Sequence, residues 1–180
     1  MNEAVFGMTD LRFPIGPFAL PGELSHADRM LAIHDIEETP GQLRSAVDDL
    51  DDSQLDTPYR PDGWSVRQVV HHLPDSHMNS YLRLKLALTE QVPVVRTYDE
   101  AAWARLPDAA APIAGSLALL ERLHQRWVYL WRALADSDWV RRLRHPELGE
   151  MSVDDLLGFY AWHGKHHVAH ITSLRERKGW

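Results

Sequence analysis

Apolar side chains recur along most of this chain with the three-to-four-residue spacing of amphipathic helices. Four stretches keep that period, and they cover residues 25–50, 65–89, 113–135 and 152–177. Ser65 and Ser152 begin two of them and suit an N-cap, because a serine hydroxyl accepts a hydrogen bond from a free N–H of the first turn. The loops between the stretches lack strand-like alternation. The sequence therefore predicts an all-α fold in which four long helices pack as a bundle.

Prolines and glycines mark the segments between these helices. Residues 1–22 are rich in both and predict an extended arm that lies across the domain, because proline cannot continue a helix. Pro40 is expected to kink the first helix or to divide it in two, and Pro74 to bend the second. The remaining connections are expected over residues 51–64, 91–112 and 136–151.

The last predicted helix carries four of the chain's eleven histidines within eight residues. At about 100° per residue, His163, His166, His167 and His170 share one face of roughly 100°, and Tyr160 lies on the same face, so it looks inward. A buried imidazole without a partner costs about 1–3 kcal/mol. Core histidines that each find a separate partner are one explanation. A metal ion, a hydrogen-bonded network or both explain four of them together more simply.

The spacing of these histidines distinguishes candidate metal ligands from candidate residues that assist them. His163 and His167 are four residues apart, which lets two helical imidazoles reach one cation. His166 and His170 form a second such pair and are interpreted as proton carriers or as hydrogen-bond partners of the ligands. No Glu follows His163, so this is not the HExxH motif of a zinc protease with its built-in base.

The second predicted helix supplies a third candidate ligand. Of two adjacent histidines, His72 lies on a polar stripe, whereas His71 points with Arg67 and Lys85 toward the expected solvent side. His77 falls on the apolar face and is interpreted as a hydrogen-bonded core histidine. Three imidazoles with a fourth position open are typical of a catalytic metal site. Imidazole suits zinc, nickel, copper and iron, so the metal stays open.

The polar stripe around His72 holds further candidates. Gln68 and Asp75 lie one turn either side of it and are interpreted as groups that orient it, with Asp75 also a candidate general base. Asn79 and Arg83 extend the stripe and are candidates for contact with a substrate carboxylate. An ordinary solvated helix face explains all four equally well.

Composition narrows the class of protein. At 180 residues, with 44% apolar and 25% charged side chains, residues 1–180 are expected to fold as one soluble domain. A net charge of −7 without a basic stripe argues against a nucleic-acid partner. The chain has neither an apolar run of about 18 residues nor a signal-peptide pattern, so no membrane partner and a cytoplasmic location are expected. The absence of cysteine excludes disulfides, thiolate ligands and a cysteine nucleophile.

Three segments resemble one known family closely. They are LDTPYRPDGWSVRQVVHHLPDSHMNSYLRLKLALTE, AAWARLP and YAWHGKHHVAHITSLRERKGW, and together with the N-terminal FPIGPF they resemble the YfiT-like branch of the DinB superfamily over nearly the whole chain. The resemblance implies a four-helix bundle of up-down-down-up order, often a homodimer, with one nickel or zinc ion held at His72, His163 and His167. Pro74 departs from the otherwise matching HHLxDSH run, which affects only the expected local helix geometry.

The same resemblance implies an enzyme that acts on a small-molecule substrate. Relatives are described as metal-dependent hydrolases, and others are similar to transferases that add low-molecular-weight thiols such as bacillithiol to electrophiles. Because the chain has no cysteine, a thiol nucleophile must come from a co-substrate, and we favour this thiol S-transferase over a hydrolase that activates water. A non-catalytic stress protein whose cation only joins the helices is the alternative of another class.

Overall fold

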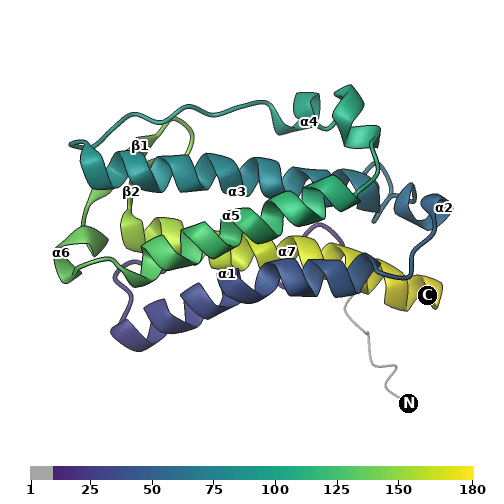
Figure 1. Ribbon diagram of the computed structural model, residues 1–180, viewed down its shortest axis with the longest axis horizontal. Coiled ribbons are helices and arrows are strands. Elements are labelled where there is room, and N and C mark those ends of the chain that lie inside the picture. The colour runs from purple at the N-terminus through teal and green to yellow at the C-terminus, as the bar shows by residue number, and fades with distance from the viewer. Residues whose placement is uncertain (1–9) are drawn as a thin grey trace, which may run out of the picture.

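Four long helices run side by side in the computed structural model, which describes residues 10–180 (Figure 1). They are α1 (His26–Val47), α3 (Val66–Thr89), α5 (Ala114–Arg132) and α7 (Val153–Lys178). Capping boxes begin three of them, because the side chains of Ser25, Ser65 and Ser152 each accept a hydrogen bond from the backbone N–H three residues later. The predicted bundle is confirmed, and α1 continues through Pro40 as a single helix.

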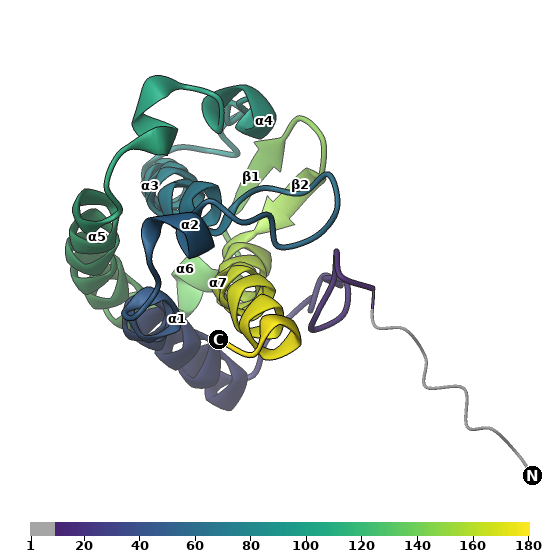
Figure 2. The ribbon, with the colours of Figure 1, turned by 90° about the vertical axis from the view of Figure 1, so that its right-hand side faces the viewer.

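The helices have the up-down-down-up order that the family resemblance implies. In Figure 1, α1 and α7 run in one direction, and α3 and α5 run in the other. Both α1 and α3 pack against α5 and α7, as the end-on view of Figure 2 also shows. Because α3 and α5 are parallel neighbours, the chain must return along the bundle between them. Residues 90–113 make that return, with the short helices α4 (Glu100–Trp103) and η1 (Pro107–Ala110).

A small hairpin closes one end of the bundle and corrects the prediction of a plain loop over residues 136–151. After the short helix α6 (Asp136–Trp139), β1 (Arg142–His145) pairs antiparallel with β2 (Gly149–Ser152). Leu143 lies opposite Met151, and both side chains are buried in the core. Strands of four residues are too short to produce a periodic signal, which is why the pattern did not show them. The other short helix, α2 (Asp52–Leu55), follows α1.

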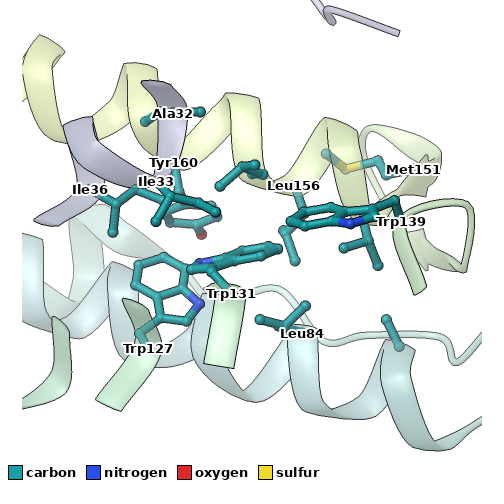
Figure 3. Packing of buried hydrophobic residues seen from close by; sticks show 14 of the residues in the cluster. Ala32, Ile33, Ile36, Leu84, Trp127, Trp131, Trp139, Met151, Leu156 and Tyr160 are labelled. Carbon is teal, nitrogen blue, oxygen red and sulfur yellow. The ribbon is translucent and has the colours of Figure 1, made fainter. Parts of the chain in front are cut away.

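The core consists of two apolar clusters along the bundle. Figure 3 shows the first, in which Trp127 and Trp131 of α5 pack near Tyr160 of α7; the Trp127 and Tyr160 rings meet edge to face with centroids 5.5 Å apart. The second cluster includes Leu43, Val70, Leu73, Leu120 and Ile171. Between the two, each long helix contributes buried polar side chains, and these include Thr39, His72, His77, His124, His163 and His167. A polar layer therefore crosses the middle of the bundle.

The described part of the predicted arm, residues 10–22, lies against α7, whereas residues 1–9 of that arm are outside the described part of the chain. Trp162 donates its indole N–H to the Gly16 carbonyl at 3.2 Å, and the Phe18 ring meets Phe159 edge to face at 5.0 Å. A Cβ on Gly158 would come within 2.7 Å of Pro21, so this glycine lets the arm approach the helix. The arm therefore covers the side of α7 next to His166 and His170, where the Phe13 ring lies 6.0 Å from His166 and the Arg12 carbonyl 3.2 Å from His170 Nε2.

Candidate metal centre

Three imidazoles from two helices meet in the polar layer. His163 and His167 occupy successive turns of α7, and His72 faces them from α3. One ring nitrogen of each lies within 4.8 Å of the other two, and the Nε2 atoms of His72 and His163 are 3.3 Å apart. The structure thus brings together the three ligands that the sequence nominates. In the part of the chain that it describes, no other group of three or more His, Asp or Glu side chains converges in this way.

The electrostatics of these rings suit a cation. Burial lowers the pKa of His72 to about 4 and holds the pKa values of His163 and His167 well below the ordinary value, and the neighbouring imidazoles add to the effect. All three rings are therefore neutral near pH 7, with lone pairs available. Nδ1 of His167 is buried without a hydrogen-bond partner among residues 10–180. Three neutral, desolvated imidazole nitrogens this close together fit zinc or another divalent ion that prefers imidazole ligands.

A cavity of about 710 Å³ lies beside this centre. His163 and His167 line it, and it extends from the arm to the hairpin. Its wall also includes Tyr59, Arg83, Tyr98, Trp162, His166 and His170. His72 borders a separate, smaller cavity of about 230 Å³ on the other side of α3. A small molecule therefore has room to reach the α7 side of the centre.

The two remaining α7 histidines line the larger cavity, outside the three-ligand group. His166 stacks on Trp162 with ring centroids 4.3 Å apart, and His170 stacks on Tyr59 at 4.0 Å. His170 Nε2 lies 3.2 Å from the Arg12 carbonyl, so it donates, and the neutral ring keeps a bare Nδ1. Both Nδ1 atoms are buried and lack partners within the described residues. Proton carriage by these two residues stays a prediction that this placement allows.

Arg83 is the buried charged residue of the cavity wall, which also carries the less buried Arg12, Arg60, Asp62, Glu100 and Glu147. Its guanidinium is about nine-tenths buried, donates to the Arg96 carbonyl at 2.8 Å and lies 3.4 Å from the Tyr160 hydroxyl. Its Nε has no partner, and no carboxylate of residues 10–180 forms an ion pair with it. A buried cation without a counter-ion is costly. Glu100 lines the same cavity without forming an ion pair with Arg83, so contact between this guanidinium and a substrate carboxylate stays a prediction that this position allows.

The other members of the predicted stripe are engaged elsewhere. Gln68 completes the capping box with Ser65 and donates to the Ala104 carbonyl at 2.8 Å, so its amide closes the start of α3 instead of contacting a cofactor. Asn79 donates to the Asp75 carbonyl of its own helix at 2.8 Å and lines neither cavity. Asp75 is half-buried in the smaller cavity, where burial raises its pKa. It does not line the larger cavity.

Two residues assigned to solvent are in fact buried. His71 lies 2.7 Å from the Ser116 hydroxyl and 3.0 Å from the Ala111 carbonyl, and Arg67 pairs with two aspartates of the α2 region. The prediction was wrong because the return segment 90–113 packs over this face of α3. A helical wheel that considers only the bundle core cannot reveal that cover. Lys85 is exposed, as predicted.

Two further histidines complete the polar layer. His77, predicted to be a hydrogen-bonded core histidine, has its Nε2 3.0 Å from Nδ1 of the candidate ligand His163. His124 of α5, which the sequence reasoning missed, lies 2.7 Å from His77. Its only signal was a polar residue between Leu120 and Trp127 on the apolar ridge of that helix.

Comparisons with known proteins agree with this picture. The model of the DinB superfamily matches residues 35–171. A protein of Bacillus mycoides (strain KBAB4) named "Putative metal-dependent hydrolase BcerKBAB4_2443" is 52% identical over 173 residues, which cover 96% of this chain and 100% of the relative. The corresponding protein of Bacillus thuringiensis subsp. konkukian (strain 97-27), BT9727_2476, has the same identity and coverage.

Two solved structures resemble the fold. YfiT from Bacillus subtilis, described as "a probable metal-dependent hydrolase with an unusual four-helix bundle topology", is 50% identical with a TM-score of 0.92, over 94% of this chain and 98% of YfiT. TT2238, a four-helix bundle protein, matches at 20% identity and a TM-score of 0.56, covering 81% of this chain and 98% of its own, and supports the fold alone. By its family match, its relatives and its buried three-histidine centre, the chain belongs to the DinB superfamily.

Proposed function

We propose that this protein is a metal-dependent enzyme that activates a small nucleophile for attack on an electrophilic small molecule. In this proposal His72, His163 and His167 hold one zinc or nickel ion. The observation that carries it is the convergence of three neutral, buried imidazoles at the edge of a cavity of about 710 Å³. A purely structural zinc site is usually closed by four protein ligands, whereas three ligands beside a cavity are typical of catalysis.

A divalent cation held at this centre supplies a Lewis acid, which lowers the pKa of a thiol or of water. The chain's own residues then bind the substrate and accept the proton. His170 lines the cavity and keeps a bare, buried Nδ1, since its Nε2 is committed to the Arg12 carbonyl. Trp162 and Tyr59 stack on His166 and His170 and hold these rings in place.

We favour a low-molecular-weight thiol of the bacillithiol type as the nucleophile. The chain has no cysteine, so the thiol must be a co-substrate. Arg83 supports a thiol that carries a carboxylate, because an anion would offset the cost of its buried, unpaired guanidinium. In the transfer, the sulfur forms a bond to the electrophilic carbon, the leaving group departs with its electron pair, and the thiol proton passes to an imidazole in the wall.

Hydrolysis is the second candidate, favoured by the names of the relatives and of YfiT. Water would take the place of the thiol, and the same wall histidines would accept its proton. The two reactions differ in whether turnover needs a thiol, so one set of assays separates them.

The test combines the zinc- or nickel-loaded protein with monochlorobimane and a thiol, and follows the fluorescent conjugate. A carboxylate-bearing thiol such as bacillithiol is compared with 2-mercaptoethanol, which carries none. We expect metal-dependent conjugation that His167→Ala abolishes, and we expect Arg83→Gln to raise KM for the carboxylate thiol only. Ester hydrolysis without thiol would favour the hydrolase. If neither assay shows turnover, the cation only joins the helices, and the proposal is contradicted.

A further inference from the structure

A line of three hydrogen bonds connects the backbone of α1 to the candidate ligand His163. Pro40 has no N–H, so the Ile36 carbonyl four residues earlier lacks its helical partner. His124 Nδ1 lies 2.6 Å from that carbonyl oxygen. Because a carbonyl only accepts, Nδ1 of His124 must carry the proton and donate it.

The direction of the first bond sets the direction of the next two. His124 is buried, and burial lowers its pKa to about 4, so the ring is neutral and its Nε2 is bare. His77 Nδ1, 2.7 Å away, therefore donates to it. A neutral His77 then has a bare Nε2, and His163 Nδ1 donates to that atom at 3.0 Å. The remaining nitrogen of His163, Nε2, keeps its lone pair and faces His72.

Packing holds the two intermediate rings in this arrangement. The His77 and His124 rings are nearly coplanar, with an interplanar angle of 15° and centroids 4.9 Å apart, so their hydrogen bond lies in the plane of both rings. The rings of Trp127 and Tyr160 pack edge to face with His77, with ring centroids 5.5 and 5.3 Å from that of His77. His77 has no exposed surface, so water does not compete for its nitrogens. His167 differs, since its Nδ1 has no partner in the described chain.

We propose that His77 and His124 are positioning residues that hold His163 in the Nδ1–H tautomer and aim its Nε2 lone pair at the cation site. Partners that fix the tautomer of a metal-binding histidine are usually a carboxylate or a carbonyl in direct contact with it. Here the carbonyl belongs to Ile36 on α1, a helix that contributes no ligand. Two imidazoles link it to His163, and the direction of its hydrogen bond sets the direction of theirs. Pro40 has a role in this line because it leaves that carbonyl free. The inference rests on the proposed function only in so far as the three histidines bind a cation.

The first test measures tautomers directly in the intact protein. With ring-¹⁵N-labelled histidine, long-range ¹H–¹⁵N spectra distinguish a protonated ring nitrogen from a bare one. We expect Nδ1–H and bare Nε2 at His124 and His77 in both the metal-free and the zinc-loaded protein, and Nδ1–H at His163 in both. An Nε2–H tautomer at His77, or at His163 in the metal-free protein at pH 7.5, would overturn the proposal. Failure of the protein to turn over any substrate would not affect this result.

The second test compares zinc affinity among variants, measured by competition with a chromophoric chelator. We expect His77→Leu to weaken zinc binding about 10–100-fold, as loss of such a partner typically does. His124→Leu should weaken it less and mix the tautomers of His163. His124→Gln should restore the zinc affinity and the single tautomer of His163, because the glutamine N–H donates to the Ile36 carbonyl while its oxygen accepts from His77. The control is His71→Leu, a residue that is also buried but is bonded to Ser116, and this variant should bind zinc like the wild type.

Equal loss of affinity in His71→Leu and His77→Leu would show general damage to the core and refute a specific positioning role. Unchanged affinity in His77→Leu would also refute it. If the leucine variants do not fold, the tautomers of the wild-type protein decide, since that measurement needs no substitution.

Discussion

Mild acid should destabilise the metal-free protein well before its carboxylates titrate. The pKa of His124 is about 4 in the folded protein, against an ordinary value of 6.5 that the unfolded chain regains. Above pH 6.5 neither state is protonated, so the residue has no effect. As the pH falls below 6.5, the unfolded chain takes up a proton that the folded chain cannot, and unfolding becomes easier. At pH 5 this difference is worth about 2 kcal/mol for His124 alone.

Other buried imidazoles shift in the same direction, because burial lowers the pKa of His77, His163 and His167 as well. His72, whose pKa is also lowered to about 4, would together with His124 remove about 4 kcal/mol at pH 5 from a typical stability of about 5–15 kcal/mol. Burial raises the pKa values of Asp75 and Glu100, which act with the opposite sign, since the folded chain then binds protons more readily. Comparison with a variant that lacks only His124 isolates the share of that histidine, because these carboxylates are present in both proteins.

Urea unfolding of the chelator-treated protein, followed by circular dichroism from pH 8 to pH 5, measures this effect. We expect a constant free energy of unfolding above pH 7 and a steep fall below 6.5. The variant His124→Gln should reduce the slope in that range by about 1.4 kcal/mol per pH unit, the contribution of one proton. A free energy of unfolding that stays flat down to pH 5, or a slope that His124→Gln leaves unchanged, would refute the reasoning.

Two substitutions test the packing of α1 against α7. In Gly164→Ala, the new Cβ would lie 2.5 Å from the Thr39 hydroxyl oxygen, so we expect thermal unfolding to show a stability lower by about 1–3 kcal/mol. Adding Thr39→Ala should recover most of that stability. An unchanged stability in Gly164→Ala would contradict the close approach of α1 and α7. In Arg29→Leu, the buried Asp154 loses a partner at 2.7 Å, so we expect the protein to lose about 3–5 kcal/mol of stability. The control Arg142→Leu removes an exposed ion pair and should cost less than about 1 kcal/mol. Equal losses of stability in the two variants would contradict the burial of the Arg29–Asp154 pair.

Local patterns in the sequence predict most of the architecture. Apolar periodicity and serine caps suffice to locate the four helices, because an amphipathic face and a capped first turn are encoded within each segment. The order of the helices is not encoded locally, and it was implied only by the family resemblance. The hairpin at residues 142–152 escaped detection because its stability comes from burying Leu143 and Met151 in the core, not from strand periodicity.

The site was predictable where it depends on single helices. Spacing on α7 and the polar stripe on α3 suffice to select His72, His163 and His167. The neighbours of these residues depend on how other segments pack: α5 brings His124 to His77, and the return segment 90–113 buries Gln68 and its surroundings. No helical wheel contains that information. The metal's identity, the homodimer, the absence of a nucleic-acid partner and the cytoplasmic location remain predictions.

No helix within residues 10–180 combines the length and the apolar character needed to cross a bilayer. The long helices are amphipathic instead, and their inward faces carry the two apolar clusters and the polar layer between them. That layer is where the sequence places most of its buried histidines, and the account of function depends on it.

Metal stoichiometry tests the central claim most directly. The full chain is purified without chelators, loaded with zinc, freed of excess ion, and analysed by mass spectrometry of the elements. We predict one zinc ion per chain for the wild type and for His71→Leu, and none retained by His163→Ala or His167→Ala. A wild-type protein that retains no metal, or alanine variants that retain as much as the wild type, would contradict a cation held by these three imidazoles.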